Sequence, residues 1–304
     1  ETIMVLEGRA QDIIDLEKKI SAFREGKIHE DKFRSLRLAR GVYGQRQQGV
    51  QMIRIKLPFG RISSQQLRKI AAISDEYSNG NLHLTTRQDI QIHHVSLDRT
   101  PELWAKLEQD DVTIREACGN TVRNVTASPE SGIAPNELFD VSPYAHAVFS
   151  YFLRKPFGQE LGRKIKIAFS NNEKDTAFTY IHDIAFIPKL NEQEEKGFKV
   201  LIGGGLGAQP FLAQVAFEFL PENKLIPFVE ATIRVFDRYG ERVSRHKARI
   251  KYLISKIGVQ EFLNLVKEEE KALLNKEFDI DTNFIQYIPQ LKKSLPTHSP
   301  VINE

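Results

Sequence analysis

Two short segments of the sequence carry pairs of cationic side chains at the two-residue spacing of a β-strand. Arg54 and Lys56 alternate with apolar residues, and Lys164 and Lys166 do the same further along the chain. Successive side chains of a strand point to opposite faces of a sheet, so each pair should share one face, opposite the apolar residues. Such like charges repel one another, and a sheet keeps them for solubility, for protection of an edge or for binding an anion.

A third segment adds polar groups that would complete an anion site. If residues 88–95 form a strand, alternation gathers four polar side chains on one face: Arg87, Asp89, Gln91 and His93. Arg123 follows in a loop rich in amide side chains. A solvated lysine edge would explain either cationic pair alone. Two independent pairs with these neighbours favour a bound anion, or a cofactor with several carboxylates, that neutralises the cations together.

The elements that would position these residues fall into two blocks. Helical spacing marks residues 9–25, and the order strand, helix, strand, strand, helix that follows is typical of a ferredoxin-like arrangement: 50–57, 63–77, 81–85, 88–95 and 101–108. The second block alternates strands and helices: helix 142–154, strands 163–169, 178–187 and 197–203, and helices 224–239, 244–256 and 259–274.

We therefore predict an α+β fold, in which a ferredoxin-like half-domain precedes a larger α/β domain. The predicted boundaries are an N-terminal helical extension at 1–48, the half-domain at 49–117, the larger domain at 118–285 and a linker or tail at 286–304. Chains of about 300 residues usually divide in this way, because single cores stop growing near that size.

Composition narrows the classes of protein. The net charge of +3 on 304 residues is too small to indicate nucleic-acid binding. No apolar run reaches the roughly 18 residues that span a bilayer, and no signal sequence opens the chain, so we expect a cytoplasmic protein with no membrane partner. The single cysteine, Cys118, excludes an internal disulfide or a metal site built from cysteines alone, and we predict no metal ligands.

Several segments, in the same order along the chain, resemble the sirohaem-dependent sulfite and nitrite reductase family. The most specific is the pattern Thr-x-Arg-Gln-x-x-Gln-x-His at 85–93. Four further segments resemble the family's first strand and turn, its Asn-x-x-Arg-Asn loop, its Arg-Lys-x-Lys strand and its glycine turn: 54–60, 118–125, 163–166 and 203–206. The resemblance extends from about residue 33 to residue 274.

The resemblance implies a six-electron reduction of sulfite to sulfide, or of nitrite to ammonia. Sirohaem, coupled to a 4Fe–4S cluster, would lie where the domains meet. Four residues match the cations that hold the substrate oxyanion: Arg54, Arg123, Lys164 and Lys166. Eight others match positions that contact sirohaem carboxylates or line its pocket: Arg87, Gln91, His93, Asn120, Arg163, Arg245, Lys247 and Arg249.

The resemblance also implies what this chain lacks. Family members supply the cluster cysteines from their C-terminal half, so we expect an N-terminal half that is inactive alone and whose partners are the remainder of the polypeptide and a ferredoxin or flavoprotein electron donor. At His83 the family often has an arginine, which leaves one carboxylate contact unmatched. Sulfite is favoured over nitrite, because the nitrite reducers tend to have a neutral amide where this chain has Lys166.

Two other functions fit parts of the sequence. The turn Gly203-x-Gly205-x-x-Ala208 satisfies a relaxed dinucleotide fingerprint, which would indicate an NAD(P)-binding protein. Alternatively, the chain is a non-catalytic module whose cationic sheet face binds an anion or an acidic partner protein.

Overall fold

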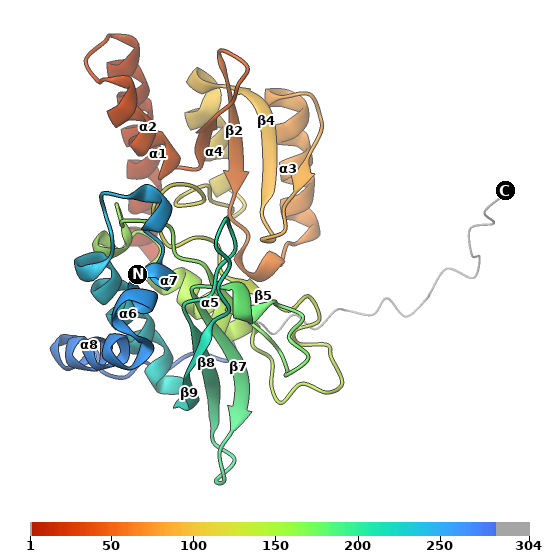
Figure 1. Cartoon of the computed structure of the whole chain (residues 1–304). Helices are drawn as coiled ribbons and strands as arrows, with labels where there is room; N and C mark the ends of the chain where they lie inside the picture. The colour runs from red at the N-terminus through yellow and green to blue at the C-terminus, as the bar shows by residue number, and fades with distance from the viewer. Residues whose placement is uncertain (1, 284–304) are drawn as a thin grey trace, which may run out of the picture.

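The computed structural model describes residues 2–283, and the predicted tail at 286–304 lies outside them. Two sheets, each with its own helices, form the two blocks of the molecule (Figure 1). The first block contains helices α1 (Thr2–Arg24), α2 (Glu30–Leu38), α3 (Ser64–Tyr77) and α4 (Thr100–Glu108), and strands β1 (Val42–Gly44), β2 (Val50–Ile55), β3 (His83–Leu84) and β4 (Ile90–Ser96).

The first sheet is antiparallel, in the order β1-β2-β4-β3. Helix α3 begins at a capping box, in which the Ser63 hydroxyl accepts the Gln66 N–H and the Gln66 side chain accepts the Ser63 N–H. The helices bury their apolar faces against the sheet, with Ile53, Ile70 and Trp104 fully enclosed. The ferredoxin-like half-domain expected from the sequence is therefore present.

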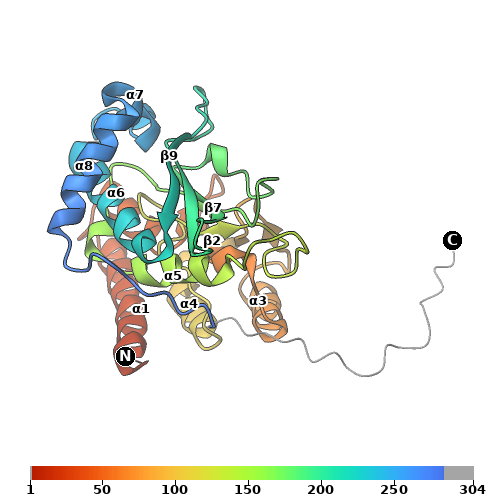
Figure 2. The same cartoon turned by 90° about the horizontal axis from the view of Figure 1, so that it is seen from below.

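Helices α1 and α2 share this core. Leu16 and Phe33 are buried in the same cluster as Ile53, and β1 extends the sheet on its outer edge. Figure 2 shows α1, α3 and α4 on the same side of the molecule. The boundary drawn between residues 48 and 49 stays a prediction.

The second block is built on a mixed five-stranded sheet. Its strands lie in the order β5 (Thr126–Ala127), β6 (Ile167–Phe169), β7 (Ile184–Leu190), β8 (Lys196–Ile202) and β9 (Gln214–Pro221). The pairs β5-β6 and β6-β7 are parallel, and β7-β8 and β8-β9 are antiparallel. Helices α5 (Ser142–Phe152), α6 (Leu225–Tyr239), α7 (Ile250–Ile257) and α8 (Val259–Ala272) complete the block, with α6 and α8 on one side of β7 and β9 (Figure 2).

Short 3-10 helices connect these elements: Pro58–Gly60, Leu97–Arg99, Pro156–Gly158, Thr179–Ile181, Glu222–Lys224 and Arg245–Lys247. The second core is aromatic at its centre, where the rings of Phe169, Phe186 and Phe198 lie 4.8–5.8 Å apart between centroids. Within the described residues 2–283, no helix is both long enough and apolar enough to cross a membrane.

The glycine turn at 203–207 corrects one prediction. It joins β8 to β9, a strand that the sequence analysis missed, and these two strands are antiparallel neighbours. A dinucleotide-binding turn leads instead into a helix and then into a parallel strand. The NAD(P)-binding alternative is therefore wrong. Gly204 is required by close packing, because a Cβ there would lie 2.3 Å from the Tyr180 carbonyl oxygen.

Candidate functional site

Arg54 and Arg123 meet at one backbone carbonyl. Arg54 is on β2, and its Nη1 lies 3.4 Å from the oxygen of Ala117, while Nη1 of Arg123 lies 3.1 Å from the same atom. Arg123 also donates from Nε to the Gly119 carbonyl at 3.0 Å. The loop that carries Arg123 thus folds back on its own arginine and holds the arginine of the other block beside it.

Lys164 and Lys166 lie next to this loop. The regular strand predicted at 163–169 covers only 167–169, but Ile165 forms a parallel bridge to Val122, and its carbonyl accepts the Arg123 N–H at 2.9 Å. Ile165 is fully buried, whereas the lysines on either side of it are half-buried. The predicted alternation of faces is therefore correct, although the chain here is a bridged segment and not a strand.

Burial and mutual repulsion lower the pKa values of these cations. Burial lowers the pKa of Lys164 to about 7, with further lowering by Arg123 and Lys166. Burial lowers the pKa of Lys166 to about 8, helped by the charges of Arg87 and Arg249. The pKa of Arg123 falls to about 10, again by burial and then by Arg54 among its neighbours. We call Arg54, Arg123, Lys164 and Lys166 the cationic cluster, because each lies within electrostatic range of another member.

A row of polar side chains crosses the first sheet to Arg54. Register places His83 opposite Gln91 on β4, and Gln91 opposite Arg54 on β2. With its amide oxygen turned toward Arg54, Gln91 accepts from Nε at 3.2 Å and from Nη2 at 2.9 Å, and its amide nitrogen donates to His83 and His93 at 3.0 and 3.2 Å. The opposite orientation would leave donors facing donors. Gln91 thus orients Arg54 and joins it to two imidazoles.

Arg87 connects the two blocks, but not from the position predicted. Gln88 has a positive φ of 61°, so Arg87 lies in a turn before β4 and not on the strand face. Its Nη1 lies 2.6 Å from Nε2 of His182, and its Nη2 donates to the Asn124 carbonyl at 2.6 Å. Since Nδ1 of His182 lies 2.7 Å from the Phe178 carbonyl and must donate to it, Nε2 is the acceptor for Arg87.

A buried carboxylate ties Arg249 to the lysine segment. Both oxygens of Asp183 accept from Arg249, at 3.1 and 2.7 Å, and Oδ2 also accepts the backbone N–H of Lys166 at 2.8 Å. The Asp183 side chain is 1% exposed. Arg163 is half-buried nearby and contributes to the lowered pKa of Lys164. Asp183 therefore fixes the backbone beneath one lysine of the cluster and the guanidinium beside it.

The remaining predicted residues are placed less centrally. Arg245 and Lys247 are exposed in a 3-10 helix. Burial lowers the pKa of Arg163, and the positive charge of Arg245 lowers it further. Asn120 is half-buried in the loop before Arg123, and its carbonyl accepts the N–H of Leu161. Of the basic run 245–249, only Arg249 is bound, within the described residues 2–283, to a side chain that contacts the lysine segment, namely that of Asp183.

Sequence reasoning missed Asp183 and His182, which hold Arg249 and Arg87. Both stand just before the apolar strand β7, and no periodicity distinguishes them. Their only signal was that two polar residues directly precede a strand whose first five residues are buried, in a sheet where β5, β6 and β7 are parallel.

The cations gathered at this site suit an anion. Among residues 2–283, no group of three or more His, Cys, Asp or Glu residues is arranged to hold a metal. Cys118 is buried, and burial raises the pKa of its thiol. Arg87 Nε is buried and has no hydrogen-bond partner in the described structure, so a donor is left that an anionic group would satisfy.

Two family descriptions match consecutive parts of this chain. Residues 43–110 match the family described as nitrite/sulfite reductase ferredoxin-like half domain. Residues 118–273 match the family described as nitrite and sulphite reductase 4Fe-4S domain.

The relatives of this chain include proteins named sulfite reductase and proteins named nitrite reductase. Sulfite reductase (ferredoxin) of Mycobacterium tuberculosis is 30% identical over 246 residues, which are 75% of this chain and 44% of that protein. Ferredoxin–nitrite reductase of Leptolyngbya laminosa is 29% identical over 228 residues, which are 73% and 44%. The structure of the M. tuberculosis NirA protein superposes with a TM-score of 0.75 at 27% identity, and covers 84% of this chain and 49% of that one. This chain spans about half the length of the relatives it matches, and it belongs to the nitrite and sulfite reductase family.

Proposed function

We propose that this chain supplies the oxyanion-binding part of a sirohaem-dependent sulfite reductase. The observation that carries the proposal is the cationic cluster, in which four basic residues from two blocks lie together with lowered lysine pKa values. Several cations held close together at half-buried positions repel one another, and an anion bound among them would remove that cost. An oxyanion that accepts several charge-assisted hydrogen bonds satisfies this arrangement.

The lysines suit a reaction that consumes protons. With pKa values lowered to about 7 and about 8, Lys164 and Lys166 release protons more readily near neutral pH than an exposed lysine does. The fixed guanidinium groups of Arg54 and Arg123 stabilise negative charge that develops on the bound anion. Proton donation is thus assigned to the lysines and charge stabilisation to the arginines.

The surrounding residues fit a carboxylate-rich cofactor. Sirohaem, when bound, would supply the electron chemistry. Four residues around the cluster are proposed to face its carboxylates or line its pocket: Arg87, Gln91, His93 and Arg163. The unpartnered Nε of Arg87 supports this assignment. The same role is proposed for four residues that lie less centrally: Asn120, Arg245, Lys247 and Arg249. Of these, Arg249 is already bound to Asp183.

A 4Fe–4S cluster does not fit this chain alone. The 304 residues contain one cysteine, and four thiolates are the usual ligand set of such a cluster. We propose that the thiolates come from protein beyond these residues and that the electron donor is a ferredoxin, as the names of the relatives suggest for those proteins.

Sulfite is proposed as the substrate, with nitrite as the alternative. A sulfite reductase and a nitrite reductase are almost equally similar to this chain in sequence, at 30% and 29% identity, so sequence identity does not decide between the two substrates. Lys166 is positively charged at a position where the nitrite reducers tend to have a neutral amide. This charge favours the anion with the greater negative charge, which is sulfite.

Isothermal titration of the chain with sulfite and, separately, with nitrite tests the proposal. We expect sulfite to bind more tightly than nitrite, and Lys164→Met/Lys166→Met to remove most of the sulfite affinity. Lys267→Met, which removes one exposed charge from α8, is the control and should bind as the wild type does. Equal affinities of the double variant and the control would overturn the assignment of the cluster, and preferential binding of nitrite would reverse the choice of substrate.

A further inference from the structure

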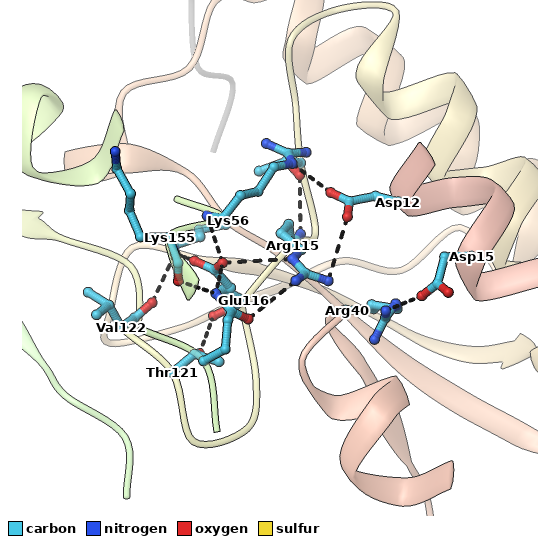
Figure 3. A network of polar contacts seen from close by, with 12 residues as sticks. Asp12, Asp15, Arg40, Lys56, Arg115, Glu116, Thr121, Val122 and Lys155 are labelled. Atoms are coloured by element: carbon cyan, nitrogen blue, oxygen red, sulfur yellow. Dashed lines mark hydrogen bonds and ion pairs between the residues drawn. The ribbon is translucent and has the colours of Figure 1, made fainter. Parts of the chain in front are cut away.

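Glu116 is a buried carboxylate on the loop that leads to the cationic cluster. Its side chain is 1% exposed, and its backbone has a positive φ of 60°, a region that residues other than glycine seldom adopt. One carboxylate oxygen accepts the Arg154 N–H at 2.8 Å and a hydrogen bond from the Gln159 amide. The other lies 3.8 Å from Nζ of Lys56 (Figure 3). The side-chain contacts thus hold a strained backbone turn in place.

Lys56 binds the far end of the same loop. It is 3% exposed, and Nζ donates to the Val122 carbonyl at 3.0 Å. Val122 directly precedes Arg123, and Lys56 follows Arg54 by two residues. Lys56 therefore links the chain segment that carries Arg54 to the segment that carries Arg123.

Glu116 acts on the opposite end of the loop. The next residue is Ala117, whose carbonyl oxygen contacts both Arg54 and Arg123. A change in the backbone at Glu116 would turn this carbonyl away and remove the shared acceptor. The pair Lys56–Glu116 thus clamps residues 116–122 at both ends.

Stability alone does not account for such a pair. Replacing a buried ion pair with apolar residues is often neutral or stabilising, so the pair is weak support for a purely structural role. A role in fixing geometry explains why both charges lie at the ends of this one loop and why the strained turn is kept.

We propose that Glu116 and Lys56 are positioning residues that hold the Ala117 carbonyl and the two arginines in the arrangement that binds the oxyanion. This inference rests on the proposed anion-binding function, and neither residue touches the anion itself.

The same network offers a matched control. Asp12 of α1 pairs with Arg154 at 2.6 Å and with Arg115 at 3.7 Å. Arg115 lies between Asp12 and Glu116 (Figure 3). Asp12→Asn removes a charge from the network without touching the loop 116–122. It should lower the melting temperature and leave sulfite affinity within about twofold, because the two ion pairs that are lost, with Arg154 and Arg115, do not involve residues 116–122.

The test measures two properties of Glu116→Gln, Glu116→Gly and Lys56→Met. Glycine at 116 tolerates the positive φ and so keeps the turn accessible if the glutamine variant fails to fold. We expect sulfite affinity to fall by about tenfold in each folded variant, the size of one lost hydrogen bond to a charged group. We also expect the Nε–H of Arg123, which donates to Gly119, to exchange faster with solvent by NMR.

The two readouts separate the two claims. If the wild type binds no sulfite, the proposed function fails, and the Arg123 exchange rate still tests positioning. If folded variants at 56 and 116 keep both the wild-type sulfite affinity and the wild-type exchange rate, the positioning role is overturned. Loss of affinity in Asp12→Asn equal to that in Glu116→Gly would also overturn it, because general destabilisation would then explain the effect.

Discussion

Arg54 and Arg123 come from different blocks of the molecule and share the carbonyl oxygen of Ala117 as an acceptor, at 3.4 and 3.1 Å. A single backbone oxygen thus fixes the separation of two guanidinium groups that face the same region. The planar guanidinium group of Arg123 presents its donors in different directions. Its Nη1 donates to the Ala117 carbonyl and its Nε to the Gly119 carbonyl.

Arg123→Lys should therefore bind sulfite at least about tenfold more weakly, because an ammonium group cannot reproduce the two directed contacts. Titration calorimetry measures the change. Arg99→Lys is the control, since Arg99 lies over the Tyr77 ring near Glu76 on the outer face of the first block. Unchanged affinity in Arg123→Lys would show that this guanidinium does not orient the anion.

Lys164→Met should stabilise the chain at neutral pH while weakening its affinity for anions. The folded pKa is lowered from 10.5 to about 7, so between these values the unfolded chain binds more protons and stability of the wild type rises with pH. The variant lacks this dependence. Allowing for partial exposure, the gain at pH 7 is on the order of 1 kcal/mol, or roughly 2–4 °C in melting temperature.

Thermal unfolding between about pH 6 and pH 10 checks the sign of this effect. The curves of the wild type and Lys164→Met should converge as the pH approaches the unfolded pKa of 10.5. A Lys164→Met variant that is less stable at pH 7, or that follows the wild-type slope, would contradict the repulsion inferred for the cluster.

Much of the fold follows from local patterns, because they require only neighbouring residues. The helix expected at 63–77, which the structure has at Ser64–Tyr77, and the apolar alternation around Ile165 were correctly predicted. The family resemblance of the segments at 85–93 and 118–125 was confirmed by the matches over both blocks.

Other features depend on contacts that no local pattern records. Arg87 was predicted on a strand face, but the left-handed turn at Gln88 sends it across to His182, 95 residues away. Strand β7 begins at Ile184 and not at 178, because Phe178 is left-handed and a 3-10 helix follows it. Asp183 gains its role only when Arg249, 66 residues later, folds against it.

Asp183→Asn should destabilise the chain by about 3 kcal/mol, because it leaves the half-buried Arg249 beside a neutral amide. The free energy of unfolding from urea titration measures this. Asp237→Asn, which breaks the exposed pair with Arg242, is the matched control and should cost less than about 1 kcal/mol. Equal losses in the two variants would show that Asp183 is not a structural counter-ion.

His182 should remain neutral well below the pH at which a free histidine titrates. Burial, then the charge of Arg87, lowers its pKa to about 3. Nitrogen-15 NMR at pH 5 should show a proton on Nδ1 and none on Nε2. Below about pH 6.5 the unfolded chain protonates this histidine and the folded chain does not, so His182 lowers the stability of the protein on acidification. Titration of this ring with a midpoint above pH 6 would contradict the assigned acceptor role.

The central claim is that Arg54, Arg123, Lys164 and Lys166 bind one oxyanion together. A crystal structure of the chain with sulfite, recorded at a wavelength where sulfur scatters anomalously, tests it most directly. Besides the peaks of the protein's one cysteine and two methionines, the account predicts one sulfur peak from a sulfite whose oxygens lie within hydrogen-bond distance of both lysine Nζ atoms and both guanidinium groups. A sulfite bound elsewhere, with these four side chains left without it, would contradict the account.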